Sequence, residues 1–406
     1  MKKHAIRAAA LAAALILCMT LCGCWDLREL DTLSFVLGAG LDAADEEGMV
    51  HFVAQISNIK ALGSSQTGGS SGGPIPPFLV SEVTSSGIAE ALQMISFKNS
   101  RTPYLHHNQV LVLGNEQAKK GILPFMDTFI RDHEMRMEVW VVVADDKARD
   151  LLTEEIHPEK ASAMVISRLV ERLKQFSDHL AVSFMNFLSK LIEPSASCIA
   201  PIMSVVTENE EKQLNFEGMA VFKADKLIGR ISPEQIEGLV WLMGQINTCT
   251  VTLRPEGGYC GVEICEPKIS ITPGFKEGKP SITLDIRGEM KMFEIQGFKG
   301  KTLVDIVPLI EENAAQTIET QVRSTFKAMQ ELGADPYALG RVFHRRMPKK
   351  WHEMKDKWEE IYPELILDIN CDLSLIDAGK VRSSVEMEGL YKEPGSTHAP
   401  EEKSND

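Results

Sequence analysis

The chain has 406 residues, of which 44% are hydrophobic and 25% charged, a composition typical of globular domains rather than of disordered or fibrous proteins. Its length is that of two or three domains. The formal net charge is -14, which argues against a nucleic-acid-binding protein, because such proteins need a basic face that displaces counterions from phosphates. The one long apolar run lies at the N-terminus, so the sequence excludes a protein that crosses a membrane several times.

The N-terminal segment has the pattern of a secretory signal. The pattern consists of a basic head, a short apolar run and a small-residue ending: Lys2, Lys3 and Arg7, then residues 8–21, then Leu21-Cys22-Gly23-Cys24. The run is shorter than the roughly 20 residues that a membrane span needs, and such a short run favours a cleaved signal. Its ending resembles a bacterial lipobox, in which signal peptidase II cleaves before the cysteine. We therefore expect a signal peptide at residues 1–23 and a diacylglyceryl group on Cys24. The alternative is an ordinary signal with an accidental cysteine.

Cleavage would make the rest of the chain more acidic, because the signal carries three basic residues and no acidic one. Such a body has no general attraction to anionic lipid. Its attachment to a membrane would depend on the acyl chains, at about 0.8 kcal/mol per buried methylene.

Five cysteines remain after Cys24, and their number is odd: Cys198, Cys249, Cys260, Cys265 and Cys371. No CxxC pair or histidine spacing predicts a zinc site. Buried free thiols are the favoured interpretation. A disulfide such as Cys249–Cys260 remains the alternative, since disulfides form outside the cytoplasm.

Residues 24–207 are predicted to form an N-terminal domain. Strand patterns cover residues 34–42, 49–56, 78–83, 109–113 and 138–143, and helical spacing covers 85–97, 122–130, 160–173 and 182–191. The Gly/Ser-rich stretch at 63–77 predicts a flexible loop inside this domain. A polar run at 208–212, after two prolines, predicts the domain boundary.

Residues 212–390 are predicted to form a C-terminal domain, which would be one unit or two subdomains. A hairpin is expected at 215–229, a helix from Ser232, and strands at 250–253, 261–266, 268–272, 281–286 and 365–370. Apolar residues at a three-to-four spacing predict a long helix from Leu303 that stops at Gly333. The polar tail at 391–406 is predicted to be disordered. Because strands and helices interleave without a regular βαβ spacing, we expect α+β domains with mixed or antiparallel sheets and packed helices.

Three short motifs approach known sites without completing them. Gly297 to Thr302 ends like a Walker A loop, but Ile295 stands where its first glycine belongs. His133-Glu134 lacks the second histidine of a zinc-protease motif, since position 137 is a methionine. His106-His107 is more simply a loop pair than a metal site. The sequence therefore predicts no catalytic residue, no metal and no cofactor.

A basic segment with two tryptophans stands out in this acidic chain. Its cations form what we call the basic cluster: Arg341, Arg345, Arg346, Lys349 and Lys350. Trp351 and Trp358 are seven residues apart and share one helix face, which predicts that both pack on the core, in a helix that Pro348 opens. For the cations two interpretations stay open. They are a solvated face, or they contact anionic lipid headgroups or an acidic loop of a membrane protein.

Four sets of motifs follow one another along the chain. The first is Gly23-Cys24-Trp25-Asp26 with Glu29-Leu30 and Gly38-x-Gly40-Leu41-Asp42; the second is 108–114, Gly121-Ile122, 131–136 and Trp140; the third is 216–222, 226–229, Glu237-Gly238 and 241–244; the fourth is Pro348-x-x-Trp351, Trp358 and Asp368. Their order resembles that of the Ger(x)C family, the lipoprotein C subunits of GerA-type spore germinant receptors. The Gly/Ser-rich loop and the tail fall outside this resemblance.

The resemblance implies a non-enzymatic receptor subunit that is needed for nutrient-triggered germination. It also implies a lipid anchor at the outer face of the inner spore membrane, beside two integral membrane subunits, A and B. A solute-binding lipoprotein that delivers a nutrient to a transporter is the alternative, although the strand order does not suggest its two α/β lobes. A cell-envelope hydrolase is a third class, but no paired acids or nucleophile motif supports it.

Overall fold

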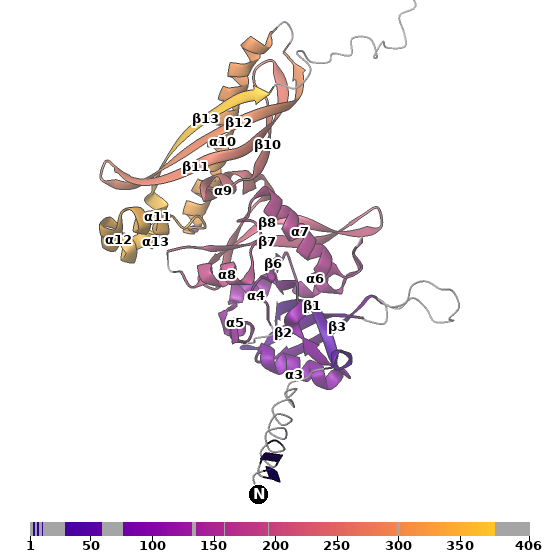
Figure 1. The fold of residues 1–406 in the computed structure, drawn as a ribbon. Coiled ribbons are helices and arrows are strands. Elements are labelled where there is room, and N and C mark those ends of the chain that lie inside the picture. The colour runs from indigo at the N-terminus through magenta and orange to yellow at the C-terminus, as the bar shows by residue number, and fades with distance from the viewer. Residues whose placement is uncertain are drawn as a thin grey trace, which may run out of the picture.

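The computed structural model describes residues 29–58, 76–131, 135–157, 159–193, 195–298 and 301–377, together with residues 3, 4, 6, 7 and 10. These residues form two β-sheets with helices packed against them (Figure 1). This arrangement confirms the predicted class of multidomain α+β fold with mixed sheets. Cys24, most of the expected signal peptide, most of the Gly/Ser-rich stretch and the whole of the tail at 391–406 lie outside the described residues.

The first sheet has nine strands in the order β3-β2-β1-β5-β6-β7-β8-β9, with β4 also paired to β1. Its centre is parallel, from β1 through β5 and β6 to β7, and its two sides are antiparallel hairpins. The strands are β1 (Leu33–Ala43), β2 (Val50–Ser57), β3 (Phe78–Ser85), β4 (Thr102–Tyr104), β5 (Val110–Leu113), β6 (Trp140–Ala144), β7 (Cys198–Glu208), β8 (Glu211–Lys223) and β9 (Lys226–Ile231).

Helices cover both faces of this sheet. They are α3 (Ile88–Lys98), α4 (Asn115–Lys120), α5 (Leu123–Arg131), α6 (Ala148–Thr153), α7 (Ser162–Phe176) and α8 (Phe184–Leu191), with short 3-10 turns at η1 (Leu30–Thr32) and η2 (Leu105–His107). Because side chains alternate along a strand, Leu111 and Val141 join the core under α3, α5 and α8, whereas Val110 and Val142 join the core under α6 and α7. Burial on both faces explains the nearly continuous apolar runs of β5 and β6.

The end of β1 holds α6 against the sheet. A Cβ on Gly38 or Gly40 would lie 2.7 or 2.9 Å from the Leu152 side chain, so only glycine admits the helix at this distance. Asp42 then accepts hydrogen bonds from the backbone N–H of Ala148 and of the next residue, at 2.7 and 2.9 Å, which satisfies the first turn of α6. Burial raises the pKa of Asp42 in spite of these bonds. The motif Gly-x-Gly-Leu-Asp therefore has a packing role here.

The second sheet is four-stranded, in the order β10-β11-β12-β13. Its pairs are antiparallel except β12 with β13, which are parallel and joined through helices. The strands are β10 (Thr248–Leu253), β11 (Gly258–Lys276), β12 (Lys279–Gly297) and β13 (Ile366–Asp377). The helices of this half are η3 (Pro233–Gln235), α9 (Ile236–Met243), α10 (Leu303–Leu332), α11 (Leu339–Arg346), α12 (Pro348–Met354), η4 (Lys355–Lys357), α13 (Trp358–Ile361) and η5 (Tyr362–Glu364).

The long helix α10 confirms the sequence prediction at both ends. Thr302 and Asp305 form a capping box at its start, and Gly333 ends it in the left-handed conformation with φ +61°. The predicted apolar positions from Ile310 to Met329 are buried. Since α10 packs against α9, β10 and β13, it joins the second sheet to the rest of the core.

The first sheet continues past the boundary expected at 208–212. Residues 208–211 make the tight turn between β7 and β8, where Asn209 and Glu210 have positive φ, and β9 follows in the same sheet. No strand was predicted at 198–208, and Pro201, which lacks the N–H that a ladder uses, lies inside β7. The second sheet begins only with β10, after α9.

Two strands expected between 261 and 272 are one strand, β11. The register against β12 shifts between Cys265 and Lys268, and Glu266 has φ +43°. Pro267 therefore marks a β-bulge inside a continuous strand and not a strand end. None of the helices in the described ranges has the length and hydropathy needed to span a membrane.

We expect Gly238→Ala to lower the free energy of unfolding by about 1–3 kcal/mol. A Cβ at this position of α9 would overlap the carbonyl oxygen of Gln321 and the hydroxyl of Thr325 on α10. Gly274→Ala in β11 is the control, because its Cβ would meet only the Ser281 hydroxyl, at 3.3 Å. Urea unfolding of both variants is the measurement; equal midpoints would contradict close α9–α10 packing.

Candidate functional site

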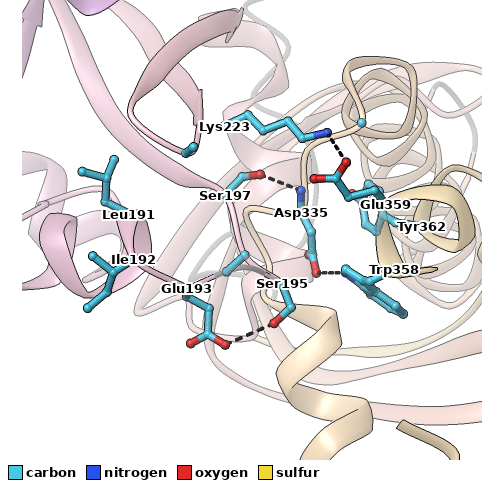
Figure 2. A pocket seen from close by; sticks show the side chains of 13 residues that line it. Leu191, Ile192, Glu193, Ser195, Ser197, Lys223, Asp335, Trp358, Glu359 and Tyr362 are labelled. Atoms are coloured by element: carbon cyan, nitrogen blue, oxygen red, sulfur yellow. Dashed lines mark hydrogen bonds and ion pairs between the residues drawn. The ribbon is translucent and has the colours of Figure 1, made fainter. Parts of the chain in front are cut away.

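The two halves meet where the segment between α8 and β7 touches the loop after α10. The Ser197 amide donates to the Asp335 carbonyl at 2.8 Å, and the Asp335 amide donates to the Ser197 hydroxyl at 3.0 Å. Figure 2 shows this contact at the centre of the junction. Beside it, Lys190 Nζ donates to the Pro336 carbonyl at 3.4 Å. Burial lowers the pKa of Lys190, and the nearby Asp335 carboxylate opposes this change.

The Asp335 carboxylate is buried in this junction, with only 5% of the residue exposed. Its Oδ2 atom accepts hydrogen bonds from the Gly340 amide at 3.2 Å and from the Trp358 indole at 3.3 Å. Its Oδ1 atom has no hydrogen-bond partner among the described residues. Burial raises the pKa of Asp335 from the ordinary 3.8 to about 6, against the effect of these donors.

Two buried tyrosines stand near this carboxylate. The hydroxyl groups of Tyr337 and Tyr362 also lack a hydrogen-bond partner within the described part of the chain. Burial, and then the charge of Asp335, raise the pKa of both tyrosines well above 10. Phe326 packs against both tyrosine rings, with ring centroids 6.1 and 6.0 Å apart. The Asp335 carboxylate and the two tyrosine hydroxyls are therefore polar groups surrounded by aromatic rings.

A pocket of about 360 Å³ opens beside Asp335 (Figure 2). Trp358 and Tyr362 line it together with Asp335, and residues 191–193 and 195–197 form the facing wall. At its rim Lys223 lies 3.3 Å from Glu359. The pocket therefore contains surfaces from both halves, and its shape depends on how the halves are oriented.

The structure places the basic cluster on α11 and α12, next to this junction. Arg341 lies 3.8 Å from Glu193 of the pocket wall, and Lys350 lies 2.9 Å from Glu353. The other three cations are exposed and form no ion pair with a described residue: Arg345, Arg346 and Lys349. Contact with a partner stays a prediction for these residues.

Both tryptophans of this segment pack in the core, as the sequence predicted. Trp351 and Trp358 are 8% and 4% exposed, and their rings meet edge to face at 5.2 Å. Phe343 packs on Trp358 at 5.6 Å. A Cβ on Gly340 would lie 2.8 Å from both Trp351 and Ser195, so α11 approaches the first half closely at this glycine. Pro348 opens α12, as expected, but α12 ends at Met354 and Trp358 begins α13, so the two rings come from two short helices and not from one face of a single helix.

The described residues of the motifs that resembled known sites make structural contacts with neighbouring residues. The Lys301 ammonium donates to the Glu256 carbonyl at 3.4 Å, and Thr302 caps α10, so the two described residues that end this motif lie at the start of a helix, as predicted. His106 stacks on Tyr104, and His107 meets Phe35 edge to face. His133-Glu134 lies outside the described residues. Within the described ranges, no three His, Cys, Asp or Glu residues gather as metal ligands.

The five cysteines after Cys24 are free thiols, as favoured, but only Cys198, Cys249 and Cys260 are buried, whereas Cys265 and Cys371 are partly exposed. Cys249 and Cys260 face other partners in the ladder, Ile264 and Leu253, so they do not form the alternative disulfide. Burial raises the pKa of Cys198 and Cys249 to about 12.

Sequence reasoning did not single out Asp335, Tyr337 or Tyr362. The available signal was local: Asp335-Pro336 follows the glycine that ends a long helix, a pattern typical of a turn. An acid in such a turn is normally solvated, and only the contacts with Ser197 and Trp358 make this one a buried group.

Two family models match the chain. Residues 26–205 match the spore germination protein N-terminal domain, and residues 217–379 match the spore germination B3/GerAC-like C-terminal domain. The chain belongs to the Ger(x)C family of spore germination proteins. The gap between the two matches contains the β7–β8 turn, so the family's division falls inside the first sheet.

Relatives of the Ger(x)C chain cover most of its length. It is 25% identical over 357 residues to the putative spore germination protein YfkR of Bacillus subtilis, covering 86% of this chain and 91% of the relative. It is 25% identical over 373 residues to spore germination protein KC of the same organism, covering 86% and 90%. The crystal structure of the GerBC protein shares the fold, with a TM-score of 0.52 at 18% identity, over 87% of this chain and 100% of that one. These relatives support a role in spore germination.

We expect Asp335 to make the protein more stable as the pH falls. The carboxyl binds its proton more tightly in the folded state, with a pKa of about 6 against 3.8, so stability is gained below pH 6 and is fully present only below 3.8. The gain is about 1 kcal/mol from pH 8 to pH 5 and approaches about 3 kcal/mol at lower pH. Urea unfolding at several pH values should show it, and Asp335→Asn should lose this part of the profile. An unchanged profile in the variant would contradict the assignment.

We expect Trp358→Ala to cost about 3–5 kcal/mol of unfolding free energy, because a nearly buried ring is removed. Trp358→Phe should cost about 1–3 kcal/mol, since it keeps a ring but leaves the carboxylate without its indole donor. Val304→Ala is the control, because Val304 is 83% exposed. Chemical unfolding measures the three variants. The expected loss of stability is largest for Trp358→Ala, smaller for Trp358→Phe and smallest for Val304→Ala, and a Trp358→Phe variant as stable as the control would speak against the Asp335–Trp358 contact.

Proposed function

We propose that the chain is the lipid-anchored, non-enzymatic subunit of a nutrient germinant receptor. It would act at the outer face of the inner spore membrane beside two integral membrane subunits, A and B. The observation that carries the proposal is the match of two consecutive germination family models behind the lipobox Leu21-Cys22-Gly23-Cys24. The names of the relatives support the germination role.

The junction also favours a non-catalytic role. Asp335 has a raised pKa, as catalytic acids often have, but its Oδ2 atom is occupied by a backbone amide and an indole. Neither group is a nucleophile or a base. Burial alone therefore explains the raised pKa of Asp335, and a catalytic role is not needed to explain it.

We assign the basic cluster to a contact with an acidic surface of a membrane subunit. Its cations lie beside the β7 and β8 side of the first sheet, where Arg341 meets Glu193. The chain enters the sheet elsewhere, at the start of β1, which pairs with β4. Strands in a sheet lie about 4.8 Å apart, so the sheet separates the cluster from this entry point. A protein partner beside the junction fits this position better than the lipid at the tether.

We expect Cys24→Ala to abolish acylation and release the protein from the membrane, because the acidic body has no other general attraction to lipid. Membrane fractionation of spores, with mass spectrometry of the N-terminus, is the measurement. Cys22→Ala is the matched control: it leaves the acceptor thiol in place and should remain anchored. Normal retention of the Cys24 variant would refute the lipid anchor.

We expect reversal of four cations, Arg345, Arg346, Lys349 and Lys350, to glutamate to weaken receptor assembly and germination while leaving urea unfolding unchanged. Co-purification of the membrane subunits and the nutrient response of spores are the measurements. The control reverses four exposed cations elsewhere in the first half that form no described ion pair: Lys147, Lys160, Arg172 and Lys174. If the variant with the reversed basic cluster assembles like the wild type, the basic cluster is solvated surface and makes no contact with a partner. Reduced binding to anionic vesicles with intact assembly would point to lipid instead.

A further inference from the structure

An exposed apolar and basic patch lies at the end of α3. We call it the entry patch: Leu79, Phe97, Lys98, Asn99, Ser100 and Arg101. Phe97 is 82% exposed and Leu79 is 52% exposed, although α3 has a buried face through Ile88, Ala91 and Ile95. Figure 1 shows α3 at the outer end of the first half, away from β10–β13.

The charge of this segment opposes that of the whole chain. No acidic residue occurs between Glu90 and Glu116 in a protein whose net charge is -14, whereas Lys98 and Arg101 fall inside this interval. The Lys98 ammonium donates to the backbone carbonyl of Glu82 at 3.0 Å rather than to a carboxylate, so its charge is not neutralised by that contact. The entering chain carries three acids before β1, namely Asp26, Glu29 and Asp31.

A groove of about 370 Å³ lies between the entry patch and the ends of β1 and β2, with Ser34 and Ser57 on its other side. Arg101, the Asn99 amide and hydroxyl groups line it, together with the exposed Leu79. Asn99 Nδ2 is buried and has no hydrogen-bond acceptor among the described residues. A guanidinium beside amide and hydroxyl donors suits a phosphate oxygen, and the apolar side chains next to it suit hydrocarbon.

The entry patch is also where the chain comes in. β4 follows Arg101 directly and pairs with the first residues of β1, Leu33 with Thr102. Cys24 precedes Leu33 by nine residues, which reach at most about 30 Å when extended. A lipid on Cys24 would therefore hold this end of the molecule close to the bilayer.

We propose that the entry patch lies on an anionic phospholipid bilayer, with Phe97 in the interfacial layer and Lys98 and Arg101 beside lipid phosphates. Aromatic rings favour that layer, and each cation near an anionic surface adds about 1 kcal/mol. The β10–β13 half then points away from the membrane. This inference rests on the lipid attachment in the proposed function, and it adds the orientation of the protein.

The test uses the full acylated chain in vesicles of phosphatidylglycerol and phosphatidylcholine. Phe97 is replaced by the photoreactive residue p-benzoylphenylalanine, and Val304, which is 83% exposed at the start of α10, is replaced in the same way as the matched control. Both positions are exposed, so neither replacement disturbs the core. After irradiation, mass spectrometry counts lipid adducts, and flotation reports attachment.

Adducts at position 97 should exceed those at position 304 by about tenfold or more, as expected for a side chain inside the interfacial layer rather than above it. Lys98→Glu/Arg101→Glu should lower the yield at 97 by at least about threefold and remove its dependence on phosphatidylglycerol. If the protein floats with the vesicles but gives equal yields of lipid adducts at the two positions, the proposal that the entry patch lies on the bilayer is wrong, and the lipid attachment still holds. A protein that does not float overturns the attachment, and the orientation falls with it.

Discussion

The orientation of the two halves depends on the burial of the Asp335 carboxylate between them. A buried charge is tolerated only where donors stay in place, and here the donors come from Gly340 and Trp358. The backbone of the same residue is paired with Ser197 of the first half. One residue thus couples three segments: its backbone pairs with Ser197, and its carboxylate accepts from Gly340 and Trp358, so a shift of either donor would leave the buried carboxylate less well paired.

The motifs that resembled the family have packing roles in this chain. The two glycines before Asp42 admit α6, Gly238 admits α10, and the two late tryptophans fill the core beside Asp335. At each of these glycines an added Cβ would lie within 3 Å of a neighbouring atom, so a larger side chain does not fit there. Function must therefore be sought on the surfaces that these contacts hold in place, namely the junction pocket, the basic cluster and the entry patch.

Periodic segments were predictable from the sequence, and segments defined by distant contacts were not. The apolar spacing of α10 and the hairpins of the first sheet follow from local pattern. By contrast, β7 was missed because Pro201 reads as a strand breaker, and the outer half of β12 was missed because its side chains alternate with charges. Asp335 was missed for a stronger reason: the residue that pairs with its backbone lies 138 positions away.

The buried cysteines bear on how long the protein can last chemically. Thiol oxidation and disulfide exchange proceed through the thiolate, and a pKa of about 12, as for Cys198, Cys249 and Cys371, leaves roughly one thiolate per 100,000 thiols at neutral pH. Such thiols react slowly with oxidants and with disulfides. The packing that sets the fold therefore also protects the thiols of Cys198, Cys249 and Cys371 from this chemistry.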